Sequence, residues 1–148
     1  MPVPPFNAAG LLPPGIHDCT IEEIRYRLGS FQQNDQRPRL FNLLAELFVE
    51  VRRSALFIAV VVDGSFVTSV VSPNDIDVLL GLPKSHDWQR EPSMAEYNVL
   101  SRRRIRRRYQ CDAFMVVDGD ASFDGLVEFF SRVRDNPDVR KGLLRIKL

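Results

Sequence analysis

The chain has 148 residues, 45% of them hydrophobic and 26% charged, which fits one globular domain with a sizeable core. Its formal net charge of +1 argues against a general nucleic-acid binder, whose affinity comes from a surplus of lysine and arginine. There is no apolar stretch of ~18 residues, no signal peptide and no disulfide framework from the two distant cysteines, so we expect a cytoplasmic protein without a membrane segment.

The N-terminal segment is rich in proline. Residues 1–16 hold five of the ten prolines together with two glycines, a composition that disfavours a regular helix or strand. Four apolar side chains in this segment can anchor it to the body of the domain. We therefore expect residues 1–18 to form an extended arm packed on the core, and residues 19–148 to form a single domain.

The rest of the chain alternates between helical and strand patterns. Apolar spacing and capping boxes predict helices over 20–28, 35–54, 93–109 and 122–133. Apolar runs predict buried strands over 56–62, 76–80 and 113–117, and an alternating pattern predicts an edge strand over 142–148. One helical turn is expected from Ser65, and a polar loop over 81–92. This order predicts an α/β fold in which helices cover a mixed sheet.

Two short motifs lie beside the first two predicted strands. The first is Gly64-Ser65, and the second, after nine intervening residues, is the pair Asp75 and Asp77. Glycine lets the backbone approach a ligand closely, and a serine that opens a helical turn offers its hydroxyl and N–H groups to a phosphate. Residues i and i+2 of a strand share a face, so the aspartates can flank a divalent metal, which prefers hard oxygen ligands. Solvated acids at a strand end are the simpler interpretation of the pair alone, but the combination predicts a phosphate and metal site.

A third carboxylate would complete such a site. The candidates flank the third predicted strand, because Asp112 precedes it and Asp118 and Asp120 follow it. If this strand runs parallel to the one that holds the aspartate pair, Asp112 lies at the same end of the sheet as the pair. We therefore predict Asp112 as a third ligand or general base, and we interpret Asp118-Gly119-Asp120 as a turn that begins the next helix.

An apolar strand that ends in Gly-Ser, with Asp-x-Asp about ten residues further on, resembles the signature of the nucleotidyltransferase superfamily. This is the fold of polymerase beta and of the minimal nucleotidyltransferases. The resemblance implies a mixed sheet flanked by helices, a nucleoside triphosphate as substrate, and transfer of its NMP to a hydroxyl of a protein or RNA acceptor. It further implies that Gly64 and Ser65 bind the nucleotide, and that Asp75, Asp77 and Asp112 hold Mg²⁺ or Mn²⁺ and act in catalysis.

Nearly the full chain also resembles an uncharacterised prokaryotic family of small proteins with a nucleotidyltransferase-like core. The shared segments are Pro4-Pro5-Phe6-Asn7, Gly10 to His17, Thr20 to Glu23, Asp63 to Thr68, Pro73 to Asp77, and Arg140 to Arg145. Small proteins of this resemblance often act in toxin–antitoxin or defence pairs, which implies a partner protein or an RNA.

The sequence also departs from active minimal nucleotidyltransferases. Those often place polar or basic residues after Gly-Ser, whereas Phe66 and Val67 stand there in this chain, and Asp63 adds a negative charge near the expected triphosphate. These departures favour an alternative, a catalytically inactive relative that binds a nucleotide or a partner protein. The sequence leaves the oligomeric state open.

Six of the seven residues in Arg102–Arg108 are arginines. They could grip a nucleic acid or the phosphates of a nucleotide, or they could form a solvated helix face. Because six arginines span nearly two helical turns, some are expected to pair with acids elsewhere. A nucleic-acid-binding module built on this helix is the third and least favoured hypothesis. In the preceding loop, Trp88 is expected to pack as an anchor, with stacking on a base as the alternative.

Overall fold

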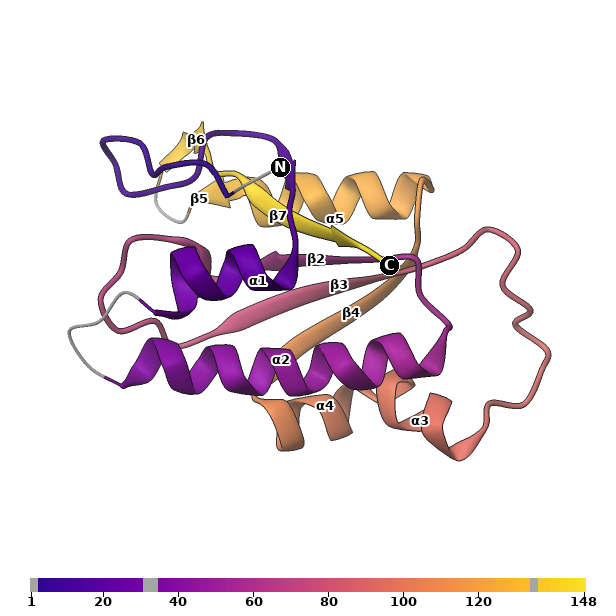
Figure 1. The fold of residues 1–148 in the computed structure, drawn as a ribbon. Helices are drawn as coiled ribbons and strands as arrows, with labels where there is room; N and C mark the ends of the chain where they lie inside the picture. Colours follow the sequence, from indigo (N-terminus) through magenta and orange to yellow (C-terminus); the bar gives the residue numbers. More distant parts are fainter. Residues whose placement is uncertain (1–2, 31–34, 134–135) are drawn as a thin grey trace.

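The computed structural model describes residues 3–30, 35–133 and 136–148. A twisted five-stranded sheet with the strand order β1-β7-β2-β3-β4 forms the centre of the molecule, and helices pack on both of its faces (Figure 1). The predicted class, an α/β fold with a mixed sheet flanked by helices, is confirmed. No helix in the described ranges combines the length and the apolar character that crossing a membrane requires.

The central sheet contains both parallel and antiparallel pairs. The middle strand β2 is antiparallel to both of its neighbours, whereas β3 pairs with β4, and β1 with β7, in parallel. A separate antiparallel pair joins β5 to β6. The bounds are β1 (Ile16–Asp18), β2 (Ala59–Asp63), β3 (Ile76–Leu82), β4 (Cys111–Val117), β5 (Arg132–Val133), β6 (Asn136–Arg140) and β7 (Leu143–Lys147).

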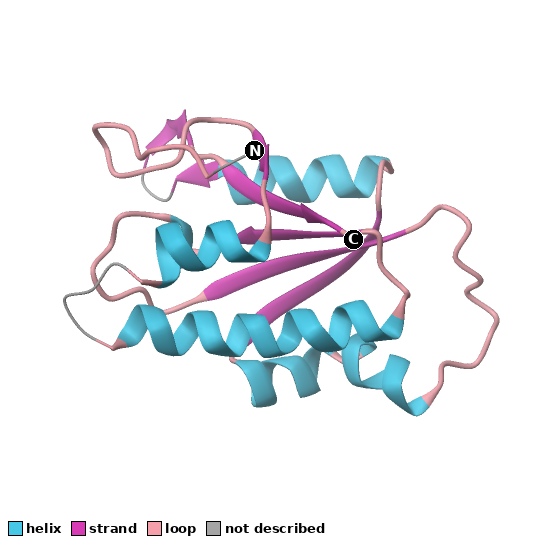
Figure 2. Cartoon of the chain, viewed as in Figure 1, coloured by secondary structure: helices cyan, strands magenta, loops and turns pink. Residues whose placement is uncertain are grey.

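Five α-helices surround this sheet in the described ranges, together with two short helical turns (Figure 2). Both predicted capping boxes are confirmed, since Thr20 caps α1 with Glu23 and Ser93 caps α3 with Glu96. The bounds are α1 (Ile21–Ile24), which continues as the π-helical turn η1 (Arg25–Gly29), α2 (Gln36–Ser54), the 3₁₀ turn η2 (Ser65–Val67), α3 (Met94–Leu100), α4 (Arg102–Tyr109) and α5 (Ala121–Ser131).

The two faces of the sheet have separate cores. Alternate side chains of a strand point to opposite faces, so Val60 and Val62 pack with the apolar stripe of α2, while Val61 packs with Phe123 and Phe130 of α5. All five residues of β2 are buried because both faces are covered. This explains why the sequence shows a continuous apolar run at this strand instead of an alternating pattern.

One predicted helix is wrong in its extent. The helix expected over 93–109 is two helices, because Ser101 leaves the helical region, with φ −91° and ψ 106°. Its hydroxyl accepts a hydrogen bond from the backbone N–H of Arg104, which makes it the N-cap of α4. Serine is a strong N-cap, so the local hydrogen bond competes successfully with a continuous helix.

Other boundaries differ where tertiary pairing decides them. The strand expected at the sheet edge over 142–148 is the internal β7, because β1, which the sequence assigned to the arm, pairs along its outer side. The helix expected over 122–133 ends at Ser131, since the next two residues pair with β6. Gly81 and Leu82, expected in the loop, continue β3, where Leu82 lies opposite Val117 of β4.

Candidate functional site

Three aspartates lie side by side across the sheet. Asp63 ends β2 and is the direct partner of Asp77 near the start of β3, and Asp77 is the direct partner of Asp112 near the start of β4. Directly opposite residues of neighbouring strands share a face, so these three, here called the acid row, project from the same side of the sheet. The parallel direction of β3 and β4, on which the choice of Asp112 depended, is confirmed.

The Gly-Ser turn lies directly against the predicted aspartate pair. Gly64 has φ 98°, and a Cβ there would come within 2.8 Å of the backbone oxygen of Asp75, so this position needs glycine. The N–H of Ser65 donates to Asp75 Oδ1 over 3.0 Å, and the Ser65 hydroxyl donates to the same oxygen. The hydroxyl in turn accepts from the N–H of Asn74 at 3.0 Å and from that of Asp75 at 3.3 Å.

These contacts change the interpretation of Ser65. The N–H and hydroxyl that the sequence assigned to a phosphate are directed at the carboxylate of Asp75. Ser65 therefore orients Asp75 in this structure, and a phosphate could use the same donors only if that carboxylate moved away.

Asp63 is the most buried member of the acid row, with 4% of its surface exposed. Lys141 Nζ lies 3.0 Å from Asp63 Oδ1 as an ion pair. Burial raises the pKa of Asp63, and the charge of Lys141 opposes that rise. No sequence pattern points to Lys141, because the contact joins β2 to the turn before β7.

Asp77 stands at the centre of the row and is half-buried. Burial first, and then repulsion from Asp75, Asp63 and Asp112, raises its pKa to about 6, while Lys141 opposes the shift. Within the described part of the chain, Asp77 has neither an ion pair nor a side-chain hydrogen bond. An additional cation would therefore be most stabilising beside this carboxylate.

Asp112 is partly open to solvent. Its side chain is 44% exposed, and Arg106 Nη1 of α4 lies 3.5 Å from its Oδ1. The competing candidate Asp118 lies at the opposite end of β4, where its N–H donates to Leu82 O over 2.8 Å. Asp120 caps α5 by accepting from the N–H of Ala121, as expected for a turn that begins a helix.

The acidic residues suit Mg²⁺ or Mn²⁺ by their chemistry. All are carboxylates, the hard oxygen ligands that these ions prefer. When all groups are ionised, the four aspartates Asp63, Asp75, Asp77 and Asp112 outweigh the charges of Lys141 and Arg106 by two units. No three acidic, histidine or cysteine side chains in the described ranges are gathered closely enough to hold an ion as they stand. Metal binding thus requires carboxylates to rotate away from their present partners.

A buried arginine holds the loop that follows the Gly-Ser turn. Arg37 of α2 is 1% exposed, and its guanidinium donates to the backbone oxygens of Leu28 (3.2 Å), Phe66 (2.7 Å), Thr68 and Val70 (2.6 Å). Burial lowers its pKa to about 10, so it stays charged at neutral pH. The sequence offered no signal for this role, which fixes η2 and the following residues beside the acid row.

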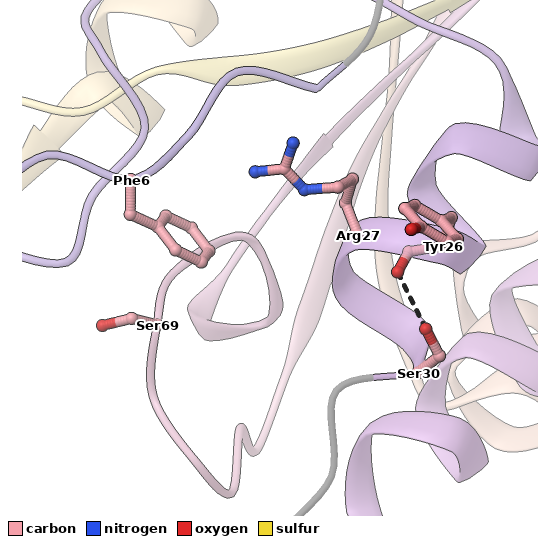
Figure 3. A pocket seen from close by; sticks show the side chains of 5 residues that line it. All are labelled: Phe6, Tyr26, Arg27, Ser30 and Ser69. Carbon is pink, nitrogen blue, oxygen red and sulfur yellow. Dashed lines mark hydrogen bonds between the residues drawn. The ribbon is translucent and has the colours of Figure 1, made fainter.

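A pocket of about 590 Å³ lies beside this loop, which lines it with Ser69 (Figure 3). The ring of Phe6 from the N-terminal segment faces Ser69, and Tyr26, Arg27 and Ser30 complete the lining from the η1 side. None of the aspartates of the site lines it, so this pocket belongs to the junction of the N-terminal segment with the body of the protein.

These features define an α/β protein with an acidic candidate site at one end of a mixed sheet. The chain belongs to DUF6932, a family of unknown function, whose family model matches residues 4–147. Neither the curated proteins nor the solved structures contain a match to the chain.

Proposed function

We propose that this protein is a metal-dependent nucleotidyltransferase with a nucleotidyltransferase-like fold, acting in the cytoplasm. In this proposal residues 19–148 form the catalytic domain, and residues 1–18 form an extended arm whose last three residues add β1 to the sheet. The observation that supports it best is the register that aligns Asp63, Asp77 and Asp112 across three strands, next to the Gly-Ser turn. Such a concentration of carboxylates is unfavourable for stability and is typical of sites that recruit a cation.

In the proposed reaction, an acceptor hydroxyl oxygen attacks the α-phosphorus of a nucleoside triphosphate. A P–O bond forms to the acceptor, the bond from the α-phosphorus to the bridging oxygen breaks, and pyrophosphate leaves with that electron pair. The hydroxyl proton passes to Asp112, whose side chain is 44% exposed and therefore within reach of an acceptor. Asp75 and Asp77 would hold Mg²⁺ or Mn²⁺ with Asp112, and the bound ion would neutralise charge on the triphosphate.

Each remaining residue of the site has a separate task. Ser65 orients Asp75 through two hydrogen bonds, which makes it a positioning residue. Gly64 lets its backbone pack closely against the backbone of Asp75. Lys141, from a distant part of the chain, partly compensates the charge of Asp63. The acceptor in this proposal is a protein or an RNA, and a partner in a toxin–antitoxin or defence pair would be one source of it.

A second candidate function is nucleotide or partner binding without turnover. Specific contacts favour it, because Ser65 already binds Asp75, and Lys141 already provides a cation to Asp63. In this case the Asp75 carboxylate occupies the Ser65 donors that a phosphate would use, and the Lys141 ammonium takes the place of a metal ion beside Asp63. A nucleotide would then bind without Mg²⁺, at a place that does not depend on the aspartate pair.

Isothermal titration with ATP, with and without Mg²⁺, separates the two functions. For a nucleotidyltransferase, binding requires Mg²⁺ and is lost in Asp75→Asn/Asp77→Asn. The matched control is Asp118→Asn/Asp120→Asn, which removes two carboxylates with the same spacing at the far end of β4 and leaves binding unchanged. Metal-independent binding that survives the first double substitution would refute the catalytic proposal.

A further inference from the structure

The arginine cluster is an exposed and largely uncompensated basic surface. All six arginines of α4 are exposed, and only Ile105 and Tyr109 of this helix are buried. Among the described residues, Arg106 is the only one of the six in an ion pair with an acid. The expected pairing with acids elsewhere therefore holds for Arg106 alone. The near-neutral net charge arises from acids that lie away from this helix.

Aromatic rings accompany these arginines. The Arg104 guanidinium lies 5.1 Å from the ring centroid of Tyr97 on α3, and Tyr97 remains 47% exposed. Arg102 lies 4.3 Å from the ring centroid of Phe114 on β4. A guanidinium held against a ring keeps its positive charge, unlike one neutralised by a carboxylate. The α3–α4 face thus combines free positive charge with an accessible aromatic surface.

The same face is hollowed in two places. One hollow, of about 370 Å³, is lined by Asn98, Arg104, Arg107, Arg108 and Tyr109. The other, of about 240 Å³, is lined by Tyr97, Ser101, Arg103, Arg104 and Arg107. Because Arg104 and Arg107 line both, the hollows are neighbours and form one basic surface.

We propose that the α3–α4 face binds single-stranded nucleic acid, with phosphates at Arg103 and Arg107 and a base stacked on Tyr97. Basic grooves that follow a backbone, with aromatic rings for unpaired bases, are the general means of binding single strands. A duplex would bury its bases and leave the Tyr97 ring without a stacking partner. A merely solvated helix face would explain the exposure, but it gives no reason for the adjoining hollows or the exposed tyrosine.

Arg106 links this face to the acid row through its contact with Asp112. A strand that continued from the hollows past Arg106 would reach the carboxylates, and its terminal hydroxyl would then be a suitable acceptor. That assignment of the acceptor rests on the proposed function. The binding itself does not, because it requires neither a nucleotide nor a metal.

The test is fluorescence anisotropy with labelled RNA and DNA single strands of about 12 nucleotides and the corresponding duplexes, in EDTA, over a range of KCl concentrations. Phosphate contacts at Arg103 and Arg107, with one or two more at Arg104 and Arg108 in the same hollows, predict a slope of log K against log salt of about −2 to −3. We expect Arg103→Gln/Arg107→Gln to weaken binding at least ~10-fold and to reduce the slope by about 1.4. Tyr97→Ala should weaken binding ~10-fold without changing the slope.

The matched control is Arg52→Gln/Arg53→Gln, which removes two adjacent exposed arginines from α2. It should leave binding unchanged, and Asp75→Asn/Asp77→Asn should bind like the wild type even if it fails to bind ATP. RNA and DNA single strands bound equally, or one preferred, both support the proposal. Absence of binding at about 50 mM KCl, tighter binding of the duplexes, or an equal effect of the two arginine pairs would overturn it.

Discussion

Asp77→Asn is expected to stabilise the metal-free protein at neutral pH and to flatten the dependence of its stability on pH. Asp77 is half-buried and surrounded by Asp75, Asp63 and Asp112, which together with burial raise its pKa to about 6 from an ordinary value of 3.8. The folded state therefore holds a proton that the unfolded state releases at lower pH. As a result, unfolding becomes easier as the pH rises through this window.

The magnitude follows from the size of the shift. One pKa unit corresponds to about 1.4 kcal/mol, so a shift of about two units sets an upper limit near ~3 kcal/mol. Because Asp77 is partly exposed, solvent screening reduces this to ~1–2 kcal/mol. The wild type should lose this stability between about pH 4 and about pH 6 and change little above that range. The asparagine side chain of the variant carries no charge, so the variant should lack this component.

Urea unfolding in EDTA at constant ionic strength, from about pH 4 to about pH 7.5, measures the effect directly. Asp118→Asn serves as the control, because Asp118 lies at the other end of β4 from the acid row. At about pH 7 the Asp77→Asn variant should be more stable than the wild type, and at about pH 4 the two should be nearly equal. Parallel pH profiles for the wild type and Asp77→Asn would show that burial and the neighbouring carboxylates do not raise the pKa of Asp77 as argued.

Three further substitutions test the surroundings of the site by chemical denaturation. Lys141→Gln should destabilise the protein by ~2–4 kcal/mol because it leaves the buried Asp63 without its cation. Adding Asp63→Asn should recover part of this loss. If the changes in unfolding free energy of the two substitutions were fully additive, the pairing would be refuted. Arg37→Lys should cost ~3 kcal/mol or more, since one ammonium cannot replace a guanidinium that serves several carbonyls; a loss below ~1 kcal/mol would contradict this role. Gly64→Ala should cost at least ~2 kcal/mol because Gly64 has a positive φ and lies against the Asp75 backbone. Gly125→Ala, on the open side of α5, should not destabilise the protein. Equal effects of the two substitutions would refute the strain argument.

Features with a local physical cause could be predicted from the sequence. Both capping boxes depend on residues three positions apart, and both form as expected. The placement of Asp112 near Asp77 required only the assumption that β3 and β4 are parallel, with a helical connection between them.

Features set by tertiary pairing could not be predicted in this way. No local pattern pairs Lys141 with Asp63 or directs Arg37 toward the carbonyls beyond the Gly-Ser turn. The break at Ser101 depends on a side-chain hydrogen bond that competes with one more helical turn. Trp88, expected to anchor its loop, is 68% exposed and instead makes an edge contact with His86. A polar loop gives no sequence signal that distinguishes these two positions of an aromatic ring.

The contacts of the acid row and of the neighbouring Asp75 indicate what would distinguish an active enzyme from a binding protein of the same fold. Asp75 is held by Ser65, Asp63 by Lys141 and Asp112 by Arg106, whereas Asp77 has no comparable partner in the described part of the chain. A divalent ion that arrives with a triphosphate would be attracted first to Asp77, and it would then compete with Ser65 for Asp75 and with Arg106 for Asp112. The ion pair between Arg106 and Asp112 is weak because the two side chains are 59% and 44% exposed. Asp112 can therefore exchange Arg106 for a metal ion at little cost. The buried Lys141 contact is the one that would persist, which leaves Asp63 as a structural acid and makes Asp75, Asp77 and Asp112 the three groups available to a metal.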